Sequence, residues 1–274
     1  MNVMEDRSIM GKIIAIMNEK GGVGKTTTTL ECGFQSCNNP KIFNPNMSCL
    51  IVDLDAQANA TKMLTGQEHI PSVFDLLVSG TDIFSLLKPT AKEWGKIICL
   101  PADRRLNEIE PHLVSKLNKE TVLKRALSKV KDMFDLILID LPPSISLLMI
   151  NAFVAADAYL IPSDTSQYSK EGIKMVKRVA DELIETGNNP SLEFLGIVLT
   201  SFQKGNSLAI KSLIEELGEE YKDKLLETRI PDSVKVMESQ SKKIPVGALD
   251  SECSVSVAYR ELSKSIFSKK EIQI

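Results

Sequence analysis

The sequence predicts an α/β protein: a single domain with a mostly parallel, twisted sheet and helices on both faces. Segments with the character of strands alternate with helical segments along the chain. The strand segments are apolar throughout, which is typical of parallel strands buried on both faces. No repeat, low-complexity segment or linker divides the chain, so we expect one domain over 1–274, with a flexible N-terminus at 1–10 and a short tail at 269–274.

Short apolar runs define the predicted strands, and the segments between them predict helices. The strands cover 12–17, 48–53, 96–100, 136–140, 158–162 and 192–200, and a last short strand ends at Pro231. The helices cover about 26–37, 103–118, 120–132, 144–156, 169–186, 207–217 and 255–268, with short helical pieces within 61–95. Gly187 is well placed as a C-terminal helix cap.

The composition excludes several classes of protein. Hydrophobic residues make up 43% and charged residues 25%, as in ordinary globular domains. With 33 Lys and Arg against 36 Asp and Glu, the net charge of −3 excludes a globally basic nucleic-acid binder but not a local basic patch. The five cysteines contain no C-x-x-C pair, so we expect reduced thiols and no zinc or iron–sulfur site. The first residues do not resemble a secretory signal, and we expect a cytoplasmic protein.

The segment from Lys20 to Thr27 lies between a predicted strand and a predicted helix, as a phosphate-binding loop requires. Its glycines let backbone N–H groups approach phosphate oxygens, and the helix N-terminus adds donors. Lys25 is placed to reach the β- and γ-phosphates, and the Thr26 hydroxyl is placed to ligate Mg²⁺. The predicted contacts are Lys20, Gly21, Gly22, Val23, Gly24, Lys25, Thr26 and Thr27.

This loop departs from the usual pattern G-x-x-x-x-G-K-[ST] by one residue. Glu19 stands where the first glycine belongs, and Lys20 provides a second lysine ahead of Lys25. The departure raises the question of what a phosphate loop gains from the additional cation.

Carboxylates follow two further predicted strands. Asp53 closes an apolar run and should lie near the phosphates and the metal, whereas Asp55 is in the following loop and could orient a water molecule. Asp140 ends the apolar run LILID, a pattern typical of a carboxylate that holds a metal-bound water. Open α/β sheets bind ligands at the carboxyl ends of their strands, so we expect the three carboxylates beside the phosphate loop.

Five motifs carry a family resemblance. In chain order they are KGGVGKTTTT, VDLDAQANAT, LILIDLPPS, NAFVAADAYLIP and TRIPDSVKVMESQSKKIPV. They resemble the ParA/MinD family of deviant Walker A ATPases, and most of all its ParA/Soj partitioning branch. The likeness runs from about Gly11 to Phe267. It implies a P-loop NTPase fold of the deviant Walker A type, with ATP and Mg²⁺ as cofactors.

The resemblance also implies roles for the residues of the site. ATP would join two protomers face to face as a homodimer, and Lys20 would cross the interface to phosphates bound by the partner. Lys25 would act in cis, and Asp55 would position the attacking water. Thr26 would ligate Mg²⁺ with Asp53 and Asp140 in support. Adenine would lie near Thr200 and the 230–234 loop, including Pro231, Asp232 and Val234.

The function implied is ATP-dependent segregation of a chromosome or plasmid. The ATP dimer would bind double-stranded DNA nonspecifically and associate with the nucleoid, and a ParB-like adaptor would stimulate slow hydrolysis that resets the cycle. Nonspecific DNA binding needs clustered cations near phosphates. The candidates are Lys204, Lys235, Lys242 and Lys243, with Lys264, Lys269 and Lys270 in reserve.

Several positions depart from the family pattern. Ala56 and Ala58 replace the proline and glycine of D-x-D-P-Q-G-N, which leaves the rigidity of this loop open. Asp232 and Lys235 occupy the two basic positions of I-P-R-N-V-R, which weakens the inference of DNA binding there. The loop at 38–46 is longer than usual. The short N-terminus leaves no room for a helix-turn-helix domain, so we do not expect sequence-specific operator binding.

The motifs leave three other functions to consider. A MinD-like membrane-cycling ATPase would use an amphipathic C-terminal helix, and Leu262, Ile266 and Ile272 could form its apolar side. We expect that helix to pack on the sheet instead, and we do not expect a membrane partner. An iron–sulfur ATPase would need cysteines beside Asp140, where none occurs. The complete set of lysines and aspartates argues against an inactive scaffold.

Overall fold

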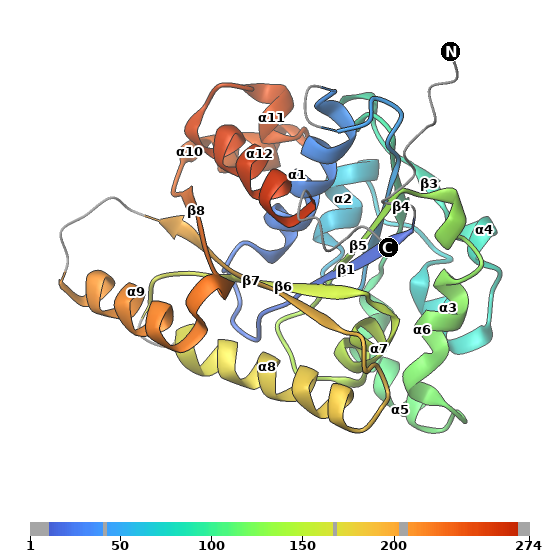
Figure 1. Ribbon diagram of the computed structural model, residues 1–274. Coiled ribbons are helices and arrows are strands. Elements are labelled where there is room, and N and C mark those ends of the chain that lie inside the picture. The colour runs from blue at the N-terminus through green and yellow to red at the C-terminus, as the bar shows by residue number, and fades with distance from the viewer. Residues whose placement is uncertain (1–10, 41–42, 167–168, 203–207, 268–274) are drawn as a thin grey trace, which may run out of the picture.

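The computed structural model describes residues 11–40, 43–166, 169–202 and 208–267 (Figure 1). Its centre is an eight-stranded sheet with the order β3-β4-β2-β5-β1-β6-β7-β8. The strands are β1 Lys12–Ile16, β2 Cys49–Asp53, β3 Lys88–Pro89, β4 Ile97–Leu100, β5 Leu136–Asp140, β6 Ala158–Ser163, β7 Glu193–Phe202 and β8 Leu225–Pro231. Only the short edge strand β3 pairs antiparallel among these neighbours. The predicted α/β class with a mostly parallel sheet is confirmed.

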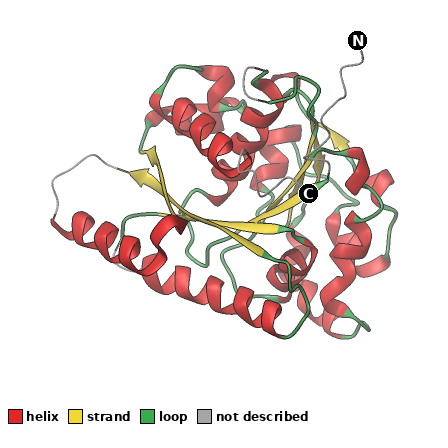
Figure 2. Cartoon of the chain, in the orientation of Figure 1, coloured by secondary structure: helices red, strands yellow, loops and turns green. Residues whose placement is uncertain are grey.

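Helices cover both faces of this sheet (Figure 2). On one face lie α1 Lys25–Asn38, α2 Asn59–Thr65, α10 Val234–Lys242, α11 Val246–Leu249 and α12 Ser254–Phe267. On the other face lie α3 Val73–Ser79, α4 Ile83–Leu86, α5 Ile109–Val114, α6 Val122–Leu127, α7 Leu147–Ala155, α8 Ser169–Glu185 and α9 Leu208–Tyr221.

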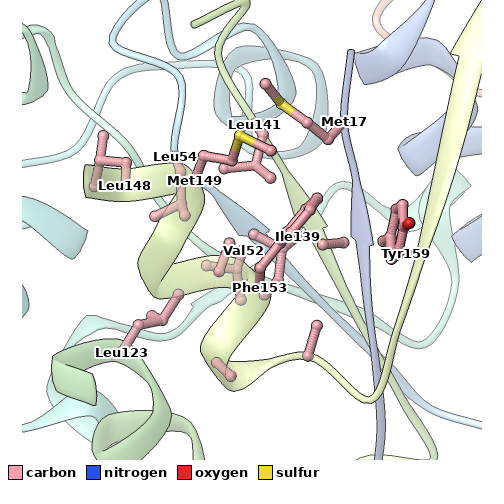
Figure 3. Packing of buried hydrophobic residues seen from close by; sticks show 14 of the residues in the cluster. Met17, Val52, Leu54, Leu123, Ile139, Leu141, Leu148, Met149, Phe153 and Tyr159 are labelled. Atoms are coloured by element: carbon pink, nitrogen blue, oxygen red, sulfur yellow. The ribbon is translucent and has the colours of Figure 1, made fainter. Parts of the chain in front are cut away.

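The sheet separates two hydrophobic cores because successive side chains of a strand point to opposite faces. In β1, Ile13 and Ala15 belong to the core under α7 and α8, whereas Ile14 and Ile16 belong to the core under α1 and α12. Figure 3 shows the first of these cores, where Met149 and Phe153 of α7 pack toward the sheet. Burial on both faces explains why the strands read as continuous apolar runs.

The structure differs from the prediction mainly in its helices. The expected helices at 103–118 and 120–132 are reduced to α5 and α6, with short 3-10 turns beside them. Helices α10 and α11 were not predicted, because the segment at 234–243 is largely polar and α11 has only four residues. The expected C-terminal helix is confirmed as a packed element, since Leu262 and Ile266 are 0% and 1% exposed. Among the described residues, no helix is long and apolar enough to cross a membrane.

Close packing between α11 and α1 depends on Gly247. A Cβ atom added to Gly247 would lie 2.5 Å from Phe34 Cε1 and 2.6 Å from Gln35 Nε2, so Gly247→Ala requires the Phe34 ring and the Gln35 side chain to move. We expect a loss of about 1–3 kcal/mol in the free energy of unfolding, measured by denaturant titration. Gly218→Ala in α9 is the matched control.

The nearest atom to a Cβ at Gly218 is Leu225 Cδ2 at 4.0 Å, so this site has room for a methyl group. Alanine should therefore raise stability there by roughly 0.5–1 kcal/mol, because it is the better helix former. Equal effects of the two substitutions would contradict the packing argument.

Candidate functional site

The three predicted motifs meet at one edge of the sheet because their strands are neighbours. Strand β5 pairs with both β1 and β2, with Ile16 opposite Asp140 and Asp53 opposite Asp140. All three strands are parallel, so their carboxyl ends lie together. The loop after β1 therefore starts next to the buried carboxylates of Asp53 and Asp140, as open parallel sheets require of a ligand site.

The loop between β1 and α1 has the backbone of a phosphate cradle. Gly22 and Gly24 have φ angles of 75° and 77°, in the left-handed region that glycine enters without strain. Gly24 is the N-cap of α1, so the free N–H groups of the first turn of this helix face the loop. The Thr200 hydroxyl donates to the carbonyl oxygen of Val23 at 2.9 Å and ties the loop to the end of β7.

Lys25 is held inside the site. It is 7% exposed, and its Nζ donates to the carbonyl oxygen of Lys20 at 2.9 Å. Burial lowers the pKa of Lys25, while the negative charges of Asp140 and Asp55 oppose this shift. An anion bound in the loop would give this buried cation a strong partner.

Asp140 lies beside the phosphate loop and has a carboxylate oxygen available to support a metal ion. Its Oδ1 accepts from Thr29 Oγ1 at 3.3 Å, whereas its buried Oδ2 has no hydrogen-bond partner in the described part of the chain. Burial raises its pKa well above the usual value, and the charge of Asp53 adds to this, while the nearby Thr26 hydroxyl lowers it. A hydrated cation beside Thr26 would satisfy the orphaned oxygen and favour the ionised carboxylate.

Asp53 is bound more tightly to protein groups than the prediction assumed. Its Oδ2 accepts from Thr61 N at 2.8 Å and from Thr61 Oγ1 at 2.7 Å, and its Oδ1 accepts from Asp55 N at 3.0 Å. Burial raises its pKa to about 6 against these hydrogen bonds. These contacts favour a role in orienting the loop, and its support of a metal stays a prediction.

Asp55 begins a turn that is held by hydrogen bonds. Its Oδ1 accepts from Gln57 N at 2.9 Å, and its carbonyl oxygen accepts from Ala58 N at 2.8 Å. Ala58 has a φ of 52°, a left-handed conformation that disfavours a residue with a Cβ atom. Hydrogen bonds within the 55–58 turn thus hold this loop, although Ala56 and Ala58 stand where the family has proline and glycine.

A cavity of about 630 Å³ lies beside these groups. Among the residues predicted for ATP, metal or catalysis, it is lined by Gly21, Gly22, Gly24, Lys25, Thr26, Thr27, Asp55, Thr200, Pro231 and Asp232, and Lys243, predicted for DNA, lines it as well. It thus joins the phosphate loop to the region predicted for adenine. Of the residues predicted for ATP, metal or catalysis, those outside its lining are Lys20, Val23, Asp53, Asp140 and Val234.

Sequence reasoning missed one wall of this cavity. Helix α10 contributes Val236, Met237, Ser239 and Gln240, and α1 contributes Glu31 one turn beyond Thr27. Ser233 begins α10, since its side chain accepts from Lys235 N at 3.2 Å, and a serine before a helical segment is a signal that could have revealed it.

The described residues contain no group of three or more His, Cys, Asp or Glu side chains that could hold a metal ion. Magnesium does not require such a group, because it is usually bound through one or two protein oxygens together with phosphates and water. Thr26 and Asp140 therefore fit Mg²⁺ better than they fit a metal held by protein ligands alone.

Lys20 does not line the cavity. It extends toward the loop after β6, where its Nζ contacts the carboxylate of Asp164 and donates to Ser166 Oγ at 2.6 Å. Its own N–H donates to Asn18 Oδ1 at 3.0 Å, and Asn18 in turn donates to the carbonyl oxygen of Pro162 at 2.8 Å. Lys20 is thus held by side chains of its own chain.

The predicted DNA-binding lysines occupy different environments. Lys235 Nζ is 3.2 Å from Glu238 Oε2, and Lys243 Nζ donates to the carbonyl oxygen of Gly66 at 2.8 Å. Lys242 is exposed at the end of α10. Lys204 lies outside the described residues, as do the reserve candidates Lys269 and Lys270. Their role in DNA binding stays a prediction.

Comparison with known proteins finds relatives along nearly the whole chain. A family model described as an AAA domain matches residues 11–194. The chain is 36% identical over 260 residues to the sporulation initiation inhibitor protein Soj of Bacillus subtilis, covering 94% of this chain and 98% of that protein. It is 31% identical to the chromosome-partitioning ATPase Soj of Treponema pallidum, covering 95% and 98% of the two chains.

Among solved structures, cobyrinic acid a,c-diamide synthase from Mycobacterium smegmatis, determined with a bound ATP analogue and magnesium, has a similar fold. Its TM-score is 0.79 at 25% identity, and the match covers 96% of this chain and 98% of that one. The order of motifs, the site at the sheet edge and the near full-length relatives all agree. The chain therefore belongs to the ParA/Soj-type branch of the ParA/MinD family of deviant Walker A ATPases.

Proposed function

We propose that this protein is an ATPase that segregates DNA, and that Mg-ATP binding switches it from monomer to a face-to-face dimer. The observation that carries the proposal is one continuous cavity, which joins the phosphate loop, Lys25 and Asp55 to the Thr200 and Pro231 region. A triphosphate on the loop and an adenine near β7 and β8 would use both ends of this cavity. Relatives named as chromosome-partitioning proteins, from Treponema pallidum and Myxococcus xanthus, support the biological role.

The chain's own groups fit phosphoryl transfer, which depends mostly on positioning and charge neutralisation. Lys25 and the N–H groups of the loop would bind the β- and γ-phosphates. Asp55, held in its turn by Gln57 and Ala58, would orient the attacking water. Bound Mg²⁺ would supply further neutralisation of phosphate oxygens, held through Thr26 and supported by Asp140.

Dimerisation would explain the presence of Lys20 in the phosphate loop. Lys20 of each protomer would reach phosphates bound by the partner, so that charge neutralisation is completed only in the dimer. The dimer would bind double-stranded DNA nonspecifically through its lysines, and a ParB-like adaptor would stimulate hydrolysis and return it to monomers. Nonspecific binding of this kind is salt-dependent.

The two lysines should separate binding from assembly. Lys25→Ala should weaken ATP binding at least about 100-fold, because a buried charge partner of the phosphates is lost. Lys20→Ala should keep ATP affinity within about threefold, a difference of under 1 kcal/mol, but stay monomeric with a slowly hydrolysed analogue. Calorimetry measures the first property and sedimentation velocity the second. Near-normal affinity in Lys25→Ala would refute the assignment of the phosphate loop.

Removing the water-orienting carboxylate should trap the ATP state. Asp55→Ala should lower the rate of phosphate release by roughly 100-fold or more, as loss of a positioned catalytic group does. ATP binding should persist, because Asp55 is not among the groups that would hold the phosphates. Phosphate release and dimer content are measured in parallel. Retained turnover would show that another residue orients the water.

Binding to duplex DNA and binding to anionic liposomes together test the biological partner. With ATP or its slowly hydrolysed analogue, the wild type should bind nonspecific duplex DNA in interferometry, and it should release the DNA with ADP. Affinity should fall steeply with added salt, because cations on phosphates release counterions. Anionic liposomes are the second surface. Binding to liposomes without binding to DNA would favour a membrane-cycling role and contradict the proposal.

A further inference from the structure

Two loops that are far apart in sequence meet because β1 and β6 are adjacent parallel strands. Ile16 pairs with Leu160, and Met17 N donates to the carbonyl oxygen of Leu160 at 3.1 Å. The chain after β1 thus runs beside the chain after β6. This places Lys20 next to Asp164, which follows the last residue of β6.

Asp164 is prepared to receive a cation. Its Oδ1 accepts from Ser169 Oγ at 2.6 Å and from Ser166 Oγ at 2.9 Å, which fixes the carboxylate and leaves Oδ2 for Lys20. Ser169 is 1% exposed and begins α8, so the arrangement is anchored in the body of the protein. Burial would raise the pKa of Asp164, but hydrogen bonds from Lys20, Ser169 and Ser166 together hold it below its usual value.

This contact competes with the role proposed for Lys20. The lysine ammonium cannot rest on Asp164 and Ser166 of its own protomer while it contacts phosphates bound by a partner. The side chains of Lys20 and Asp164 are 32% and 26% exposed, so the ion pair is partly shielded from water and contributes more than a fully solvated one. Dimerisation must therefore break it in each protomer.

We infer that Asp164 is a cis latch, which holds Lys20 on its own protomer and opposes dimerisation until ATP is bound. The inference rests on the proposed function, since it concerns regulation of the same lysine. Asp164 acts through Lys20 and is a positioning residue. In the nucleotide-free chain, Lys20 stays bound to Asp164. When ATP is bound, its phosphates compete with Asp164 for the Lys20 ammonium.

The first test measures the contact itself in the nucleotide-free monomer. An amine-reactive reagent should label Lys20 several-fold faster in Asp164→Asn than in the wild type, with exposed Lys242 as the internal reference in peptide mass spectrometry. Asp164→Ala provides a second variant, and thermal melting checks that each variant is folded. The matched control is Asp181→Asn, which removes a different lysine partner, since Asp181 pairs with Lys177 at 2.8 Å on the surface of α8. An unchanged labelling rate in both Asp164 variants would overturn the contact.

The second test measures dimerisation by sedimentation velocity with a slowly hydrolysed ATP analogue. Two latches open per dimer, and each contributes about threefold, so Asp164→Asn should lower the dimer Kd about tenfold. Asp181→Asn should leave it unchanged. A dimer of equal or weaker affinity in Asp164→Asn would overturn the latch. A wild type that stays monomeric would instead contradict the proposed function, and the labelling result would still decide the contact.

Discussion

The parallel pairing of β1 between β5 and β6 is the constraint on which the site depends. Through β5 it sets the phosphate loop beside Asp140 and, one strand further, beside Asp53. Through β6 it sets the same loop beside Asp164. One central strand therefore serves two neighbours, one carrying the groups of chemistry and the other carrying the partner of Lys20. A shift in this register would separate the lysines from both sets of carboxylates.

Burial disfavours the charged forms of the two carboxylates at the centre of the site. Asp53 and Asp140 are both 0% exposed and are register partners on adjacent strands. Burial raises the pKa of both carboxyl groups, and the negative charge of Asp53 raises that of Asp140 further. Lys25 offsets part of this repulsion but is itself buried, which lowers its pKa. Each of these groups would gain a favourable partner from a cation and a polyphosphate. Binding of that combination would offset part of the free-energy cost of burying these charges.

Much of this arrangement could be predicted because it depends on local patterns. Apolar runs ending in Asp53 and Asp140, and a glycine-rich turn before a helix, indicate strand ends and a phosphate loop without reference to tertiary structure. The contacts that could not be predicted join residues distant in sequence or depend on weak local patterns. Thr61 binds Asp53 through its backbone and its hydroxyl, and Asp164 binds Lys20 across 144 positions. Helix α10 has mixed polarity because it covers a cavity rather than a core.

The lysine that departs from the usual phosphate-loop pattern is best understood as a side chain with two alternative anions. In the single protomer its anion is Asp164, a carboxylate fixed by serine hydroxyls. In the proposed dimer its anion would be a polyphosphate of higher charge, which would displace the carboxylate. Since ADP carries less negative charge than ATP, the same competition favours return of the lysine to its own protomer after hydrolysis. A single ion pair would then couple the state of the nucleotide to the state of assembly, without requiring any rearrangement of the sheet.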